Sequence, residues 1–185
     1  PQLCRGCPHS DTFELINRAR EGYEKSIVTS DIGCYALGAL PPYKSIETIV
    51  CMGASLGVAK GAAEAGFTPV VATIGDSTFL HSGTTHLVDA VANNTPMTVV
   101  IMDNSTVAMT GGQETMLESS AIQRLVEGIG VEQEHLRIIE PLKKNAEANL
   151  AVLKEEMAYS GVSVIISIRE CLETVKKRKK SGGAS

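Results

Sequence analysis

Val70-Val71-Ala72-Thr73-Ile74 runs directly into Gly75-Asp76-Ser77, and this stretch decides the fold. A short β-branched and apolar run that ends at a glycine is typical of a buried strand. Residues 97–102 form a second run of this kind, which ends in Asp103-Asn104. The segment between the two runs is long enough for one crossover helix, so we expect the strands to lie side by side and parallel.

The rest of the chain alternates between strand-like and helix-like patterns. This alternation predicts an α/β fold, namely a doubly wound, mostly parallel six-stranded sheet with helices on both faces. We expect the other strands at residues 26–29, 48–51, 136–139 and 162–168, and helices at residues 10–22, 52–66, 84–93, 119–130 and 141–160. We expect one domain over residues 1–175 and a basic, disordered tail over residues 176–185.

Composition and charge argue against several classes of protein. The 185 residues are 43% hydrophobic and 21% charged, as in an ordinary globular domain. No apolar run approaches the roughly 18 residues that cross a bilayer, and the first residues lack the apolar core of a signal peptide, so we expect a cytoplasmic location and no membrane partner. Without the five basic residues at 176–180, 12 basic residues face 21 acidic ones. An acidic body with no aromatic residues beside the basic tail is unlike a nucleic-acid-binding protein.

Oxygen-bearing side chains at the carboxyl ends of the two strands predict a cation and phosphate site. Asp76 supplies a carboxylate and Asn104 an amide oxygen, both of which Mg²⁺ accepts while it keeps part of its shell for phosphate oxygens. Asp76 alone would be explained as a helix N-cap, but Asn104 and the flexible loop at Gly111-Gly112 favour a ligand role. Three hydroxyls lie nearby in the sequence: Ser77, Thr78 and Thr110.

The five cysteines predict a second site. An odd number of cysteines in a chain of this type argues against a disulfide framework. The spacing of Cys4 and Cys7 suits Zn²⁺ or an iron–sulfur cluster. Cys34 and Cys171 each follow a predicted strand on the same rim of the sheet, whereas Cys51 is expected inside a strand. The residues alone leave zinc and iron–sulfur open.

Two further features have more than one interpretation. The small residues at 53–55 open a predicted helix, where they either pack tightly on the sheet or offer free backbone N–H groups to a ligand. His9 follows Cys7-Pro8, where it either makes a hydrogen bond at a helix start or contacts a substrate or cofactor.

Three motifs together resemble the 2-oxoacid:ferredoxin oxidoreductases. Gly75-Asp76-Ser77 with a distant Asn104 is similar to the diphosphate-binding motif of thiamine-diphosphate enzymes, with Ser77 in place of the usual third glycine. Residues 103–113, Asp-Asn-x-Thr-x-Ala-Met-Thr-Gly-Gly-Gln, narrow the resemblance. Residues 4–9, Cys-x-Gly-Cys-Pro-His, and residues 31–35, Asp-Ile-Gly-Cys-Tyr, add to it. The chain resembles most the diphosphate-binding domain in the alpha subunit of indolepyruvate ferredoxin oxidoreductases.

The resemblance implies a role for each matching residue. The side chains of Asp76 and Asn104 and the carbonyl of Thr106 would bind Mg²⁺, while Ser77, Thr78 and Thr110 would contact the diphosphate. Other residues would line the thiamine diphosphate: Asp31, Ile32, Gly33, Cys34, Met52, Gly53, Ala54, Ser55, Gly75, Ala108 and Met109. No catalytic side chain is expected with certainty, because the cofactor carries the chemistry, although His9 is a candidate.

The resemblance also implies a redox centre and partners. Cys4, Cys7, Cys34 and Cys171 would hold a [4Fe–4S] cluster, with four-thiolate zinc as the rival. The enzyme would oxidatively decarboxylate a 2-oxo acid, with an aryl pyruvate as one candidate. Coenzyme A would take the acyl group and ferredoxin the electrons. A separate pyrimidine-binding domain or subunit would complete the cofactor site, in a hetero-oligomer with a dimeric core.

Two alternative functions remain open from the sequence. One is a non-oxidative thiamine-dependent decarboxylase or lyase that uses zinc or free thiols. The other is a non-catalytic subunit that binds the cofactor only as structure.

Overall fold

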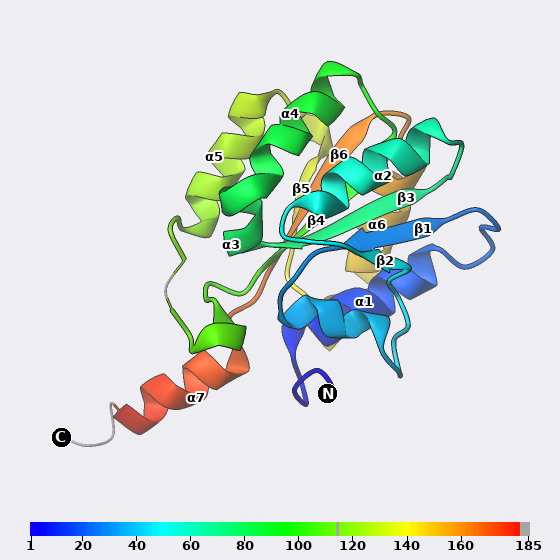
Figure 1. The fold of residues 1–185 in the computed structure, drawn as a ribbon. Helices are drawn as coiled ribbons and strands as arrows, with labels where there is room; N and C mark the ends of the chain where they lie inside the picture. Colours follow the sequence, from blue (N-terminus) through cyan, green and yellow to red (C-terminus); the bar gives the residue numbers. More distant parts are fainter. Residues whose placement is uncertain (114, 182–185) are drawn as a thin grey trace.

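The fold is a parallel sheet between two layers of helices, as the alternating pattern predicted. A computed structural model describes residues 1–113 and 115–181. Within this part of the chain all strand pairings are parallel, and the strand order is β2-β1-β3-β4-β6-β5 (Figure 1). The strands are β1 (Ile27–Ser30), β2 (Thr48–Ile49), β3 (Val70–Gly75), β4 (Met97–Asp103), β5 (Leu136–Ile139) and β6 (Val162–Ile168).

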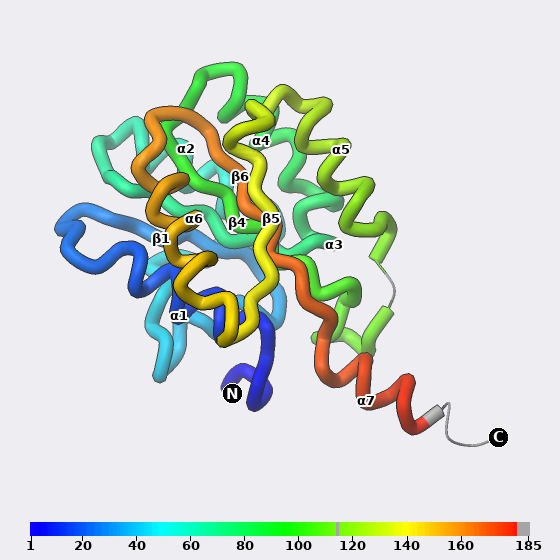
Figure 2. Tube along the Cα trace, turned by 180° about the vertical axis from the view of Figure 1, so that it is seen from behind, coloured from blue at the N-terminus to red at the C-terminus, as the bar shows by residue number. Residues whose placement is uncertain are grey.

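Helices cover both faces of the sheet, each over its own apolar core. Helices α1 (Pro8–Ala19) and α6 (Ala146–Ala158) bury Phe13, Ile16 and Leu153 against one face. Helices α2 (Ala54–Glu64), α4 (Thr84–Ala92) and α5 (Ser119–Ile129) bury Leu56, Leu87 and Ile122 against the other. Figure 2 shows α1 and α6 from behind the view of Figure 1. Because both faces are covered, β3 and β4 are buried along their whole length.

The order of the strands places a crevice at the carboxyl ends of β1 and β3. The chain forms β1, adds β2 on one side of it and then crosses back to add β3 on the other side. The loops that follow β1 and β3 therefore leave the sheet in opposite directions. In open α/β sheets, ligands bind beyond the carboxyl ends of the strands at such a point.

A helical run follows β3 directly. It comprises α3 (Asp76–Thr78), a π-helical stretch at Phe79–Gly83, and α4. Stretches of π-helix inside longer helices occur frequently at functional sites. The run thus begins with the aspartate of the predicted cation site.

The basic C-terminal segment differs from its prediction. We expected a disordered tail from residue 176, but residues 176–181 continue helix α7 (Leu172–Ser181), which extends away from the body of the domain in both views (Figures 1 and 2). The Lys176 Nζ lies 2.7 Å from Oε1 of Glu173, one turn earlier in the helix. The Arg178 guanidinium forms an ion pair with the Glu170 carboxylate at 2.8 Å. Such pairs offset the repulsion among the basic residues. The predicted tail at residues 182–185 lies outside the described part of the chain.

Some element boundaries also differ. Helix α1 begins at Pro8 rather than at residue 10 or 11, because proline suits the first turn of a helix. Helix α6 begins at Ala146, after a 3₁₀ turn at Lys143–Asn145, rather than at Pro141. Strand β2 ends at Ile49, so Cys51 is exposed and the prediction of a core position for it is wrong. Among the described residues, no helix is both long and apolar enough to cross a membrane.

Candidate functional site

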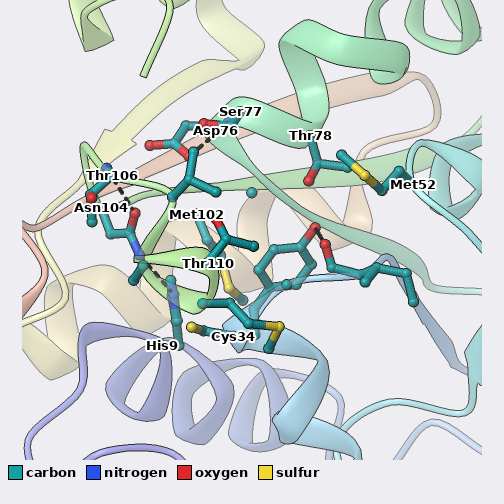
Figure 3. Close-up of a pocket in the computed structure, with 17 residues that line it drawn as sticks. His9, Cys34, Met52, Asp76, Ser77, Thr78, Met102, Asn104, Thr106 and Thr110 are labelled. Carbon is teal, nitrogen blue, oxygen red and sulfur yellow. Dashed lines mark hydrogen bonds between the residues drawn. The ribbon is translucent and has the colours of Figure 1, made fainter. Parts of the chain in front are cut away.

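A cavity of about 170 Å³ lies at the carboxyl ends of β1, β3 and β4 (Figure 3). Loops from all three strands form its walls, as expected for the crevice between β1 and β3. His9 and most of the predicted cofactor-lining residues line it: Ile32, Gly33, Cys34, Met52, Gly75, Asp76, Ser77, Thr78, Asn104, Thr106, Ala108, Met109 and Thr110. The structure therefore brings together residues from five segments of the sequence.

Four predicted residues do not line this cavity: Asp31, Gly53, Ala54 and Ser55. The Asp31 side chain is fully buried beneath the crevice and accepts hydrogen bonds from the Ser55 backbone N–H and hydroxyl, both at 2.7 Å. Burial raises the pKa of the Asp31 carboxyl, although the hydrogen bonds from Ser55 oppose this rise. Asp31 thus fixes the start of α2 to the end of β1.

Asp76 is buried at the cavity wall with its carboxylate held by backbone donors. Its Oδ1 accepts from the Ser77 N–H at 2.6 Å and its Oδ2 from the Ser105 N–H at 3.0 Å. Burial raises the pKa of Asp76 to about 7, and the nearby Asp103 carboxylate adds to the rise, while the Ser77 N–H opposes it. A cation beside Asp76 would offset the cost of burying its negative charge, so this carboxylate is suited to act as a metal ligand.

Asn104 faces the same cavity from the end of β4. Its Oδ1 accepts from the Thr106 N–H at 3.2 Å, and its Nδ2 lies 3.3 Å from His9 Nε2. Ser105, which lies between Asn104 and Thr106, has a φ of 59°. This left-handed backbone conformation turns the chain back toward the cavity. The prediction that the Thr106 carbonyl is a third ligand remains a prediction. Within the described residues, no group of three or more His, Cys, Asp or Glu side chains is placed to hold a metal ion.

The hydroxyl of Ser77 fits a phosphate contact. It is buried and has no hydrogen-bond partner, although buried hydroxyls are normally paired. Ser77 lines the cavity beside Asp76, so its hydroxyl could donate a hydrogen bond to the oxygen of a bound phosphate. Thr110 is different, because its hydroxyl already donates to Gln113 Oε1 at 2.8 Å.

Sequence reasoning missed Tyr35 as a lining residue, along with Met102 and Val107. The Tyr35 ring lies so close to two glycines that a Cβ added at Gly33 or Gly75 would come within 2.4 or 2.6 Å of it. Its hydroxyl donates to the Ile32 carbonyl at 3.3 Å. The motif Asp-Ile-Gly-Cys-Tyr, which contains both Gly33 and Tyr35, could have indicated this role. A glycine has no Cβ, so Gly33 and Gly75 permit the close approach of the ring.

A second cavity, of about 130 Å³, lies next to the first, and four of the five cysteines line it: Cys4, Cys7, Cys34 and Cys171. All four thiols are free. Burial raises the pKa of Cys7 to about 11 and raises that of Cys34. The Cys7 and Cys34 thiols are therefore protonated at neutral pH, and a metal would have to displace these protons in order to bind. The structure thus brings together the four cysteines that were predicted as a set.

The two cavities share one wall. His9, Cys34, Asn104 and Ala108 line both of them. Figure 3 shows His9 and Cys34 side by side below Asn104. Burial lowers the pKa of His9 to about 4, so its imidazole is neutral. The neutral His9 ring therefore lies in the wall between the cavity that contains Asp76 and the cavity lined by the four cysteines.

Residues 31–167, well over half of the chain, match the family model described as thiamine pyrophosphate enzyme, C-terminal TPP binding domain. The chain belongs to this family of cofactor-binding domains.

Comparison with individual proteins confirms the predicted resemblance. The chain is 38% identical over 181 residues to indolepyruvate oxidoreductase subunit IorA of Archaeoglobus fulgidus, which covers 92% of the chain and 28% of the relative. It is 35% identical over 186 residues to the IorA subunit of Methanothermobacter thermautotrophicus, covering 93% of the chain and 29% of the relative. The chain therefore spans less than a third of the length of these relatives.

A solved structure has the same fold. It is described as the 2-oxoglutarate:ferredoxin oxidoreductase from Magnetococcus marinus with 2-oxoglutarate, coenzyme A and succinyl-CoA bound. The similarity has a TM-score of 0.77 at 20% identity and covers 91% of this chain and 63% of that chain. This comparison supports the α/β architecture predicted from the sequence.

Proposed function

We propose that the chain is the thiamine-diphosphate- and Mg²⁺-binding part of a 2-oxoacid:ferredoxin oxidoreductase. The observation that carries the proposal is the wall shared by the two cavities, one with a carboxylate and an amide and the other with four thiols. A cofactor that releases electrons would lie directly beside a centre that accepts them. The family match and the relatives named as oxidoreductases support the same assignment.

The residues of the first cavity would bind and orient the cofactor. Asp76, Asn104 and the Thr106 carbonyl would hold Mg²⁺, and Ser77 and Thr78 would contact the diphosphate. Cofactor-lining roles follow for the others: Ile32, Gly33, Cys34, Met52, Gly75, Ala108, Met109 and Thr110. Thiamine diphosphate supplies the electron sink for decarboxylation, and the protein supplies position and electrostatics. Asp31 and the segment at 53–55 would act beneath the cofactor, by fixing the crevice.

The second cavity would hold a [4Fe–4S] cluster. In such a cluster each thiolate binds a different iron, so the ligands surround a volume rather than converge on one ion. Cys4, Cys7, Cys34 and Cys171 surround a cavity in this way. Electrons would leave through this cluster to ferredoxin. We place the protein in the cytoplasm, in keeping with its free thiols.

A partner would cover the cavity mouth. Ile32, Met52 and Met109 line the cavity and yet are 45%, 43% and 54% exposed. Large apolar side chains gathered at a site mark an interaction surface. A pyrimidine-binding domain or subunit would cover them and complete the cofactor site, within a hetero-oligomer that has a dimeric core.

The substrate would be a 2-oxo acid, with coenzyme A as acyl acceptor. The name of the IorA relatives makes an aryl pyruvate the first substrate to test. The Magnetococcus marinus enzyme, whose structure has coenzyme A and succinyl-CoA bound, supports acyl transfer to coenzyme A.

Anaerobic purification followed by iron, sulfide and zinc analysis tests the proposal. We expect a brown protein with roughly four irons per chain, as one [4Fe–4S] cluster requires. Cys171→Ser should lose most of the cluster, because the thiol lines the cavity. Cys51→Ser is the matched control and should keep it, because Cys51 lies outside the cavity and is exposed.

Other results would contradict the proposal. Stoichiometric zinc in a colourless protein would favour the decarboxylase or lyase alternative, as would carbon dioxide release without ferredoxin reduction when the partner is added. Cofactor binding without turnover in the assembled complex would favour a non-catalytic subunit.

A further inference from the structure

Asn104 is held at three of its atoms, by two backbone N–H donors and by the His9 ring. Its side-chain Oδ1 faces the Thr106 N–H at 3.2 Å, and its Nδ2 faces His9 Nε2 at 3.3 Å. Its main-chain carbonyl accepts from the Cys171 N–H at 3.1 Å. Asn104 is itself buried. It therefore has little freedom to reorient without breaking one of these contacts.

The contacts determine which end of the amide faces which neighbour. The Thr106 N–H is a donor, so the Asn104 oxygen must face it, and the NH₂ group must then face His9. His9 must accept this hydrogen bond through Nε2, with its proton on Nδ1. The reverse orientation would place two donors against each other at Thr106. Rotation of the amide is thus opposed at Thr106 by a donor of fixed direction, and at His9 when the imidazole keeps its proton on Nδ1.

His9 is itself fixed in place. It lies in the first turn of α1, is buried, and contacts the Tyr35 ring edge-to-face with the ring centroids 6.0 Å apart. It lies two residues after Cys7 and lines both cavities. His9 therefore holds the amide nitrogen of Asn104 at a constant place between the two sites.

We propose that His9 is a positioning residue that keeps the carbonyl oxygen of Asn104, and not its NH₂ group, directed to the cation. The proposal rests on the proposed function, because it assumes that Asn104 is a ligand of Mg²⁺. An NH₂ group cannot bind Mg²⁺, so an amide that flips destroys the ligand while leaving the residue in place. Loss of a group that orients a metal ligand costs roughly 10- to 100-fold in metal affinity.

Two variants of His9 separate the accepting atom from the bulk of the ring. His9→Leu removes the acceptor at Nε2 and keeps an apolar side chain, so Mg²⁺ affinity in the presence of thiamine diphosphate should fall by roughly tenfold or more. His9→Gln can place an amide oxygen near the former Nε2 position and should retain most of the affinity. Titration calorimetry of the purified protein measures both constants, and thermal unfolding without Mg²⁺ shows whether either variant has lost its fold.

A second background makes the test specific to amide orientation. Asn104→Asp carries two oxygens, so it presents an oxygen to the cation in either orientation. His9→Leu should therefore weaken Mg²⁺ binding in the Asn104 protein but leave it unchanged in the Asn104→Asp protein. A structural role for His9 would lower the affinity in both backgrounds.

Three results decide the matter. Mg²⁺ affinity of His9→Leu equal to that of the wild-type protein would overturn the proposal, as would equal losses in the two backgrounds. A loss confined to the Asn104 background supports it. If the wild-type protein binds no Mg²⁺ with thiamine diphosphate, the proposed function fails first, and the role of His9 fails with it.

Discussion

At the scale of single residues, two serines share one unusual property of their hydroxyl groups and differ in where they lie. The hydroxyls of Ser45 and Ser77 are both buried without a hydrogen-bond partner. An unpaired buried hydroxyl costs about 1–3 kcal/mol, so natural proteins rarely contain one without reason. Ser77 lines the cofactor cavity, whereas Ser45 does not. Ser45 therefore serves as a control for the proposed contact of Ser77 with the diphosphate.

Replacing each serine by alanine tests this difference. Both Ser45→Ala and Ser77→Ala should leave the free energy of unfolding unchanged or raise it by about 1 kcal/mol, because each removes an unpaired polar group. Only Ser77→Ala should weaken thiamine diphosphate binding, by about 5- to 10-fold for one lost hydrogen bond. Urea unfolding and cofactor titration measure the two effects. Equal cofactor affinity in both variants would show that Ser77 does not contact the diphosphate.

Individual residues were predicted from the sequence where chemistry alone selects them. Asp76 and Asn104 could be named because each follows a predicted strand on the same rim, and both line the cavity, while their role as ligands stays a prediction. Asp31 was placed beside the cofactor by the family resemblance, together with Ile32 and Gly33, but its side chain turns away to Ser55. Sequence shows that a residue belongs to a loop, but not to which side of the loop its side chain points.

At the scale of elements, Asp31 joins the end of β1 to the start of α2. Asp31→Ala should lower the free energy of unfolding by about 1–3 kcal/mol, because the Ser55 N–H is left buried and unpaired. Asp31→Asn should cost less, about 1 kcal/mol, because an amide can accept from the Ser55 N–H and donate to its hydroxyl. Urea unfolding of both variants measures the difference. No loss in Asp31→Ala would show that α2 begins independently of β1.

The pH dependence of the same pair gives a second measurement. Burial raises the folded-state pKa of Asp31 above its unfolded value, so the folded protein holds this proton more tightly. The contribution of Asp31 to stability is therefore largest below the unfolded pKa and falls as the pH rises through the folded pKa. Asp31→Asn removes the titrating group, so this fall should be smaller in the variant. An unchanged pH profile would contradict the assignment.

Elements were predicted best where apolar content is continuous. Strand β6 lies where it was expected, because a buried strand in a parallel sheet is largely apolar and has clear ends. The short edge strand β5 also lies where it was expected, although only Ile139 in it is buried. Helix α7 was missed, because a run of basic residues gives no apolar face, and local ion pairs accompany the helix instead. Strand β2 was predicted too long, since Val50 and Cys51 are exposed in the loop that follows Ile49.

At the scale of the whole molecule, exposed apolar residues identify the side that a partner would cover. Met109 is 54% exposed at the cavity mouth, and Ile138 is 52% exposed on the edge strand β5. Met109→Glu should weaken association with a pyrimidine-binding partner by roughly tenfold or more, because a charge would be buried there. Ile138→Glu is the control with matched exposure and should have no effect. Sedimentation of the mixed subunits without cofactor measures the affinity, and equal effects would contradict this choice of face.

The overall architecture was predictable because one strand–helix alternation admits few folds, and the family match agrees with it. Of the strand order, which decides where the cavity lies, only the pairing of β3 with β4 was predicted, and it is confirmed. The adjacency of the two cavities was expected only in outline, from Cys34 and Cys171 following strands on the same rim. It depends on the start of α1 and the end of β6 meeting at one rim, and those segments are separated by most of the chain.

The shared wall has a consequence for anyone who would redesign this protein. Four residues line both cavities: Cys34, His9, Asn104 and Ala108. A substitution made at one of them to adapt the thiol cavity to a chosen metal therefore also alters the neighbouring cavity. The two sites therefore do not form separable modules that can be optimised one after the other. Engineering either of them must begin from residues that face one cavity only, such as Cys4 on one side and Thr78 on the other.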